Sequence, residues 1–232
     1  MRVETVLLDA GNTVLEIDYA FVAEAIVAAG GATDADDVRR AERHARVALD
    51  PLLHDRSTEG RDVKRRYFEL TFAGLAGAPP ADPAAVVAAI DALENLWRVP
   101  APDAAATIDA LRARGLRVGV VSNSDGTVER VLERVGLRDR LDVVIDSAVV
   151  GVEKPNPEIF HHALRALGAA AATAIYVGDL PAVDVTGAHA AGLVPVLMDP
   201  LGLWPTAVDA VRIARLADLP ELIRRGKKNS SS

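Results

Sequence analysis

Residues 3–13 of the chain read Val-Glu-Thr-Val-Leu-Leu-Asp-Ala-Gly-Asn-Thr. The apolar run that ends at Leu8 is typical of a strand buried on both faces of a parallel sheet. Asp9 therefore lies at the tip of a predicted strand. Because open α/β sheets bind ligands at the carboxyl ends of their strands, Asp9 is the first candidate site residue.

From about residue 102 onward, strand-like and helix-like segments alternate. Strands are predicted at 116–121, 143–145, 174–177 and 194–197, with helices at 127–135, 157–167 and 182–191. This alternation predicts an α/β fold with a doubly wound, parallel, Rossmann-like sheet covered by helices on both faces. The strand at 3–8 belongs to the same sheet.

The region between the first strand and residue 98 has a different pattern. Four helix-like stretches occur at 20–29, 34–49, 60–77 and 83–97, separated by Gly30-Gly31, Pro51 and Pro79-Pro80, and we expect no strand among them. This pattern predicts an inserted all-α helical cap over 16–98, on the face of the sheet where Asp9 emerges. The α/β core domain then comprises 1–15 and 99–226, and we expect 227–232 to be a disordered tail.

Composition narrows the class of protein. Half of the 232 residues are hydrophobic, which is enough for a sizeable core, and the formal net charge is -7. This charge argues against a nucleic-acid partner or a membrane surface, although a local pocket for a small anion is compatible with it. The chain has no cysteine, which excludes disulfides, and no apolar window long enough to span a membrane. We therefore expect a cytoplasmic protein.

Further polar residues follow the predicted strands. Ser122 and Asn123 come directly after the strand at 116–121. Lys154 lies in the loop Gly-Val-Glu-Lys-Pro-Asn-Pro at 151–157, and Asp179 and Asp184 lie in Gly-Asp-Leu-Pro-Ala-Val-Asp at 178–184. Since the carboxyl ends of parallel strands share one edge of a sheet, these residues and the first aspartate should surround one crevice.

In order and context, these pieces resemble the four motifs of the haloacid dehalogenase (HAD)-like hydrolase superfamily, in its subgroup with a helical cap between motifs one and two. The resemblance covers nearly the whole chain outside the cap. It implies a hydrolase, in most members a phosphatase, that acts on a small phosphorylated metabolite through an aspartyl-phosphate. The sequence does not indicate an oligomeric state.

The resemblance also implies roles for individual residues. Asp9 would be the nucleophile, and Mg²⁺ would be held by Asp9, the backbone carbonyl of Gly11 and Asp179. Carboxylates that converge on one site repel each other, so a divalent cation that prefers oxygen ligands would neutralise them. Asp184 would support the metal or hold Lys154.

The remaining motif residues would act on the phosphoryl group. Ser122 and Asn123 would bind it, and Lys154 would offset the charge around the nucleophile and the phosphate. Thr13 would form a hydrogen bond near the nucleophile and stabilise the turn after it.

The first motif departs from the usual family pattern at Gly11. Most phosphatases of the superfamily carry a second aspartate there, which donates a proton to the leaving alcohol and then activates water. Such acid-base help is worth about 10²- to 10⁴-fold in rate. A chain with glycine at this position should therefore act most slowly on substrates with poor leaving groups.

Three alternatives stay open. Phosphonatases of the superfamily use a cap lysine to form a Schiff base, and Lys64 is the only lysine of the predicted cap. Dehalogenases use the aspartate to attack carbon and accept halide on a cap arginine, for which Arg39 and Arg40 are candidates. The third alternative is a weakly active or inactive protein that binds a phosphorylated ligand or a partner.

Overall fold

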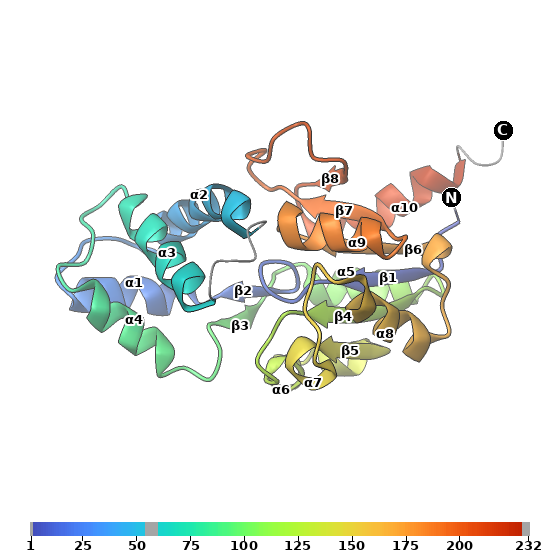
Figure 1. The fold of residues 1–232 in the computed structure, drawn as a ribbon, viewed down its shortest axis with the longest axis horizontal. Coiled ribbons are helices and arrows are strands. Elements are labelled where there is room, and N and C mark those ends of the chain that lie inside the picture. Colours follow the sequence, from blue (N-terminus) through green and yellow to red (C-terminus); the bar gives the residue numbers. More distant parts are fainter. Residues whose placement is uncertain (1, 54–59, 229–232) are drawn as a thin grey trace. The chain divides into compact units, whose positions relative to one another are not determined.

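The computed structural model describes residues 2–53 and 60–228 (Figure 1), and residues 1, 54–59 and 229–232 lie outside the described part. The chain divides into two compact units. The core unit comprises Met1–Glu16 and Arg98–Ser232, and the helical unit comprises Ile17–Trp97. Of the predicted tail, residues 229–232 lie outside the description, whereas residues 227 and 228 are the last residues of a helix.

The core unit contains a six-stranded sheet in the order β5-β4-β1-β6-β7-β8, with all pairings parallel (Figure 1). The predicted doubly wound α/β fold class is confirmed. The strands are β1 (Thr5–Leu8), β4 (Arg117–Ser122), β5 (Val143–Asp146), β6 (Ala174–Gly178), β7 (Val194–Met198) and β8 (Val211–Ile213). Strand β8 was not among the predicted strands.

Strand β1 lies between β4 and β6, so its neighbours cover both of its edges. Thr5 is level with Arg117 on one side and Ala174 on the other. All four residues of β1 are buried, as expected for a parallel strand covered on both faces. The carboxyl ends of β1, β4 and β6 therefore meet at one edge of the sheet.

The helices of the core unit are α5 (Ala104–Arg112), α6 (Val128–Arg134), α7 (Ser147–Val150), α8 (Pro157–Leu167), α9 (Thr186–Ala190) and α10 (Leu219–Lys228). The helix predicted at 157–167 has the expected bounds, the one at 127–135 is shorter, and the one at 182–191 is a π-helical turn over 181–185 followed by an α-helix over 186–190. The helices at 147–150 and 219–228 were not predicted. Side chains of α8 and α9 pack with β1, β4, β5 and β6 in one apolar cluster. Local signals explain the bounds of α8: Asn156 accepts from the backbone N–H of Glu158, and Gly168 ends the helix with φ of 57°.

The helical unit contains α1 (Tyr19–Ala28), α2 (Ala35–Leu53), α3 (Gly60–Ala73) and α4 (Pro83–Asp91) around an apolar cluster. The expectation that 16–98 lacks strands is wrong at its ends, because β2 (Leu15–Ile17) and β3 (Trp97–Pro100) pair in a two-stranded sheet. Pro51 does not end α2 but lies in its last turn. None of the described helices combines the length and apolar character that a membrane crossing requires.

A buried carboxylate joins two segments of the helical unit. Asp37, in the first turn of α2, accepts from the backbone N–H groups of Ala76 (3.0 and 3.1 Å) and Gly77 (3.1 Å). Thr33 also donates to it, at 2.9 Å. The Ala76 N–H holds the pKa of Asp37 below its usual range, with further lowering by Gly77, Thr33 and Arg40 and some opposition from burial.

We expect Asp37→Asn to lower the free energy of unfolding at pH 7 by about 1.5–3 kcal/mol, the usual worth of hydrogen bonds to a charged group. Because the folded pKa is depressed, this stabilisation is present above the unfolded pKa of about 3.9 and is lost as pH falls through the folded value. Urea unfolding at pH 7 and pH 3 measures it. The exposed neighbour Asp36 is the control, and Asp36→Asn should cost less. An equal loss at both pH values would contradict the assignment.

Candidate active site

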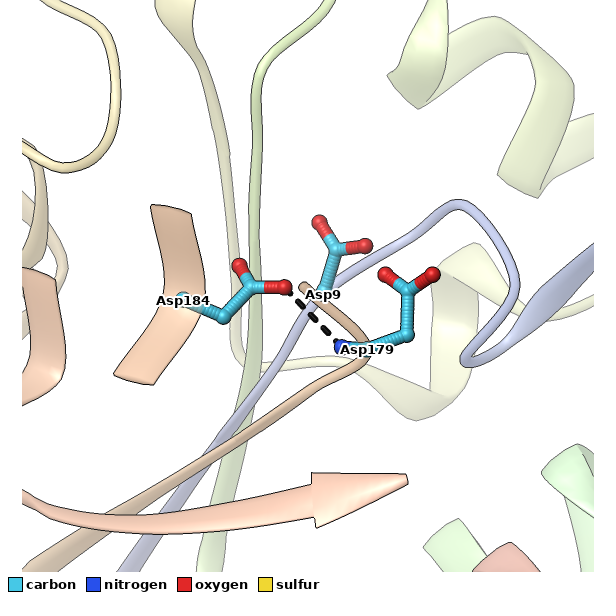
Figure 2. Close-up of side chains that lie close together, drawn as sticks. All are labelled: Asp9, Asp179 and Asp184. Carbon is cyan, nitrogen blue, oxygen red and sulfur yellow. Dashed lines mark hydrogen bonds between the residues drawn. The ribbon is translucent and has the colours of Figure 1, made fainter. Parts of the chain in front are cut away.

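Three buried carboxylates lie close together at the carboxyl edge of the sheet. Asp9 directly follows β1, Asp179 directly follows β6, and Asp184 lies in a π-helical turn, η3 (Pro181–Val185). One oxygen of each carboxylate lies within 4.8 Å of the others, and Figure 2 shows their side chains grouped together. Irregular turns of this kind often occur at functional sites. The three acids could hold a metal ion.

Lys154 supplies the positive charge of this cluster. Its Nζ donates to Asp9 Oδ1 at 2.6 Å, to Asp184 Oδ1 at 2.8 Å and to the hydroxyl of Tyr176 at 2.8 Å. The lysine side chain is only 3% exposed. A buried ammonium needs such partners, since an unpaired charge in the interior is strongly destabilising.

Asp184 has both carboxylate oxygens engaged by the protein. Oδ1 accepts from Lys154 (2.8 Å) and Tyr176 (3.1 Å), and Oδ2 accepts from the backbone N–H groups of Asp179 and Leu180, both at 2.9 Å (Figure 2 draws the bond to Asp179). These four donors match the four acceptor positions of a carboxylate. Of the two roles expected for Asp184, this geometry favours holding the lysine.

Asp9 is engaged differently. Its Oδ1 accepts from Lys154, whereas its Oδ2 has no hydrogen bond with another residue in the described part of the chain. Burial raises the pKa of Asp9 to about 7, against the lowering effect of Lys154 and with further raising by Asp184 and Asp179. Burial lowers the pKa of Lys154, but Asp184 and Asp9 outweigh it and hold that pKa above its usual value.

Burial is the largest cause of the raised pKa of Asp9, and the neighbouring acids add to it. Three carboxylates face one ammonium, so ionisation of all the acids leaves an excess of negative charge in a buried site. An oxygen-preferring divalent cation beside Asp9 and Asp179 would remove that excess. The donor set therefore fits such an ion.

The loop after β4 is joined to Lys154 through Asn123. The Lys154 N–H donates to Asn123 Oδ1 at 2.7 Å, and Asn123 Nδ2 donates to the Lys154 carbonyl at 3.0 Å. The amide of Asn123 thus binds the peptide groups of Lys154, and the phosphate contact expected for Asn123 stays a prediction. Ser122 is buried at the last position of β4.

The turn after Asp9 differs in part from expectation. The Thr13 backbone N–H donates to the Ala10 carbonyl at 3.3 Å, but its buried Oγ1 has no partner among the described residues. The side-chain hydrogen bond expected of Thr13 is therefore not made. Asn12 has φ of 55°, and its Nδ2 donates to Asp179 Oδ2 at 3.4 Å. Gly11 forms an isolated bridge with Leu15.

Two residues near the site, Tyr176 and Asp146, were not among the predicted site residues. The tyrosine lies in an apolar strand, and nothing in its local sequence distinguishes it from a core aromatic. Asp146 is the last residue of β5. It could have been found in the same way as Asp9, as a polar residue at the carboxyl end of a predicted strand. Its carboxylate accepts from the backbone N–H groups of Gly126 (3.0 and 3.1 Å) and Ala148 (3.0 Å), which stabilises the loop after β4.

Comparison with known proteins agrees with this fold. The family model of the haloacid dehalogenase-like hydrolases matches residues 3–192. The chain is 40% identical over 118 residues to haloacid dehalogenase-like hydrolase domain-containing protein 3 of Bos taurus, covering 50% of this chain and 47% of that protein. It is 37% identical over 135 residues to the glyceraldehyde 3-phosphate phosphatase of Methanopyrus kandleri, covering 56% and 57%.

Structural similarity extends over nearly the whole chain. The L-2-haloacid dehalogenase of Xanthobacter autotrophicus, with chloropropionic acid covalently bound, has a TM-score of 0.62 at 22% identity, covering 96% of this chain and 98% of that one. At this identity the likeness shows the fold alone. The chain belongs to the haloacid dehalogenase-like hydrolase family. Its matches span about half the length of the curated relatives named above.

Because Gly178 has no side chain, the carboxylate of Asp184 can pack against its backbone. A Cβ at this position would lie 2.3 Å from Asp184 Cγ and 2.4 Å from Oδ2, closer than any real contact. We expect Gly178→Ala to displace this carboxylate and to lower the free energy of unfolding by about 1–3 kcal/mol, as overpacking does.

Urea unfolding measures this effect. Gly74→Ala is the matched control, because its added Cβ would meet its nearest neighbours at 3.4 Å, an ordinary contact. The control should change stability by less than about 1 kcal/mol. Equal stability of Gly178→Ala and the wild type would show that Asp184 can move at little cost.

Proposed function

We propose that the protein is a Mg²⁺-dependent phosphatase that acts on a small phosphorylated metabolite through an aspartyl-phosphate on Asp9. The observation that carries the proposal is the position of the Asp9 carboxylate. It lies at the end of the central strand, with Oδ1 bound by Lys154 at 2.6 Å and two further carboxylates beside it. The curated relative from Methanopyrus kandleri bears the name of a phosphatase of a small sugar phosphate.

In the proposed reaction, Asp9 attacks phosphorus and the alcohol or acid leaves on the opposite side. Ser122, Asn123 and the N–H groups of their loop bind the phosphoryl oxygens. Lys154 stays beside Asp9 and offsets the charge that accumulates there, since phosphoryl transfer depends mainly on placement and electrostatics. Water then hydrolyses the aspartyl-phosphate.

Asp9, Asp179 and the carbonyl of Gly11 would hold the Mg²⁺. The bound ion would neutralise the carboxylates and polarise the phosphoryl oxygens. Asp184 would contribute through Lys154, because its four acceptor positions are engaged by protein donors.

The residues that would serve the alternative chemistries are engaged elsewhere in the helical unit. Lys64 forms an ion pair with Asp91 and its side chain is half-exposed. Arg39 pairs with Asp36 and lies over the ring of Tyr19. No specific observation favours a Schiff base on this lysine or a halide site on this arginine.

A substrate panel tests the proposal. We expect the wild type to release phosphate from acetyl phosphate, 4-nitrophenyl phosphate or glyceraldehyde 3-phosphate in the presence of Mg²⁺, with loss of activity in EDTA. Asp9→Asn should lower kcat by more than about 10³-fold, as removal of a nucleophile does in other hydrolases. Asp109→Asn, which changes an exposed aspartate of α5, is the control and should keep full activity.

Three outcomes would contradict the proposal. Metal-independent halide release from 2-haloacids would establish the dehalogenase alternative, and phosphonoacetaldehyde cleavage that is lost in Lys64→Arg would establish the phosphonatase. A wild type without turnover of any of these substrates would favour a ligand-binding or partner-binding role.

Glycine at position 11 predicts which substrates are hydrolysed faster. Because Gly11 cannot protonate a leaving alcohol, we expect acetyl phosphate to be hydrolysed faster than alkyl phosphates. Gly11→Asp should raise kcat/KM for alkyl phosphates by up to about 10²-fold, the lower end of general-acid effects, and change acetyl phosphate much less. Steady-state kinetics with both substrates measure the difference. An equal change for both would mean that a missing acid does not limit the reaction.

A further inference from the structure

Tyr176 has a polar group where the surrounding core is apolar. The residue lies on β6, three positions before Asp179, and is fully buried. Its ring packs edge-on against Phe160, with centroids 4.8 Å apart and an interplanar angle of 88°. The ring is therefore held firmly by the core, and its hydroxyl has a defined position.

That hydroxyl lies between the lysine and two acceptors. It accepts from Lys154 Nζ at 2.8 Å, and it lies 3.1 Å from both Asp184 Oδ1 and the Val121 carbonyl. A phenol has one proton to donate, so these two oxygens share it, and its lone pairs remain for the ammonium. The tyrosine thus acts as an acceptor toward Lys154.

The three hydrogen bonds of Lys154 use all three protons of the ammonium. Two of the acceptors, Asp9 and Asp184, are carboxylates on different segments, and either alone would draw the ammonium toward itself. The third, Tyr176, is neutral and is carried by a ring packed in the core. Its hydroxyl accepts the third N–H of Lys154 and so fixes the orientation of the ammonium without adding a charge.

We propose that Tyr176 is a positioning residue, whose hydroxyl holds the Lys154 ammonium between Asp9 and Asp184. The inference rests on the proposed function, in which this ammonium offsets charge at the nucleophile. Misplacement of a catalytic group by about 1 Å can cost about 10²-fold in rate. Because Tyr176 is fully buried, its effect should fall on kcat and leave substrate binding nearly unchanged.

The test compares Tyr176→Phe with the wild type on acetyl phosphate in Mg²⁺. The substitution keeps the ring on Phe160 and removes only the hydroxyl. We expect kcat to fall about 10- to 100-fold, with KM changed less than about 3-fold. Thr5→Val is the matched control, since it removes a buried hydroxyl of β1 that has no partner among the described residues, and it should keep both constants.

A second measurement does not depend on turnover. The ¹⁵N ammonium signal of Lys154, assigned by its loss in Lys154→Met, should be sharp in the wild type because three acceptors hold the group. It should broaden or exchange faster with water in Tyr176→Phe and stay unchanged in Thr5→Val. A merely structural role of the ring would leave this signal as it is.

The outcomes separate the two proposals. A wild type without turnover but with the expected change of the ammonium signal would contradict the phosphatase function and not the positioning of Lys154. An active wild type with unchanged kcat in Tyr176→Phe, or an unchanged ammonium signal, would overturn the positioning role alone. A Tyr176→Phe chain that does not fold would also overturn it, because the hydroxyl would then be a structural requirement.

Discussion

The burial of the Lys154 ammonium among Asp9, Asp184 and Tyr176 is the interaction on which the rest of the site depends. A buried charge is tolerated only when its partners are in place, and here those partners come from β1, β6 and the turn after β6. They meet because β1 and β6 are adjacent and parallel. The backbone of Lys154 is held in turn by Asn123, which follows β4 on the other side of β1.

The helical unit contains a second buried cluster of charged and polar side chains, whose balance of charge differs from that of the cluster around Lys154. Glu42 accepts from the hydroxyls of Tyr19 (3.0 Å) and Tyr67 (2.7 Å) and forms an ion pair with Arg46 at 2.7 Å. There the carboxylate accepts from one cationic donor and two neutral ones. In the core unit, three acids face one base. That excess negative charge, and not burial as such, makes the core cluster a candidate for a cation.

The fold class could be predicted because continuous apolar runs and helix caps are strong local signals. The apolar run of β1, and α8 with its Asn156 cap and Gly168 end, follow from residues that are adjacent in the chain. Strands β2 and β3 could not be predicted in this way, since neither has the continuous buried apolar run of β1. Pro51 misled the prediction because a proline usually ends a helix, yet α2 continues to Leu53.

The sequence by itself determined that acids and a lysine follow successive buried strands, because strand ends can be recognised from the apolar runs before them. Only the tertiary structure decided which partners each of these groups binds. Asp184 accepts from four protein donors, Oδ2 of Asp9 has no partner among the described residues, and the hydroxyl of Tyr176 binds the ammonium. The contacts of Asp184 Oδ2 are local, four and five positions away, whereas those of the Lys154 ammonium join side chains 22 to 145 positions apart. Such distances are set by strand order and register, which no local pattern of residues contains.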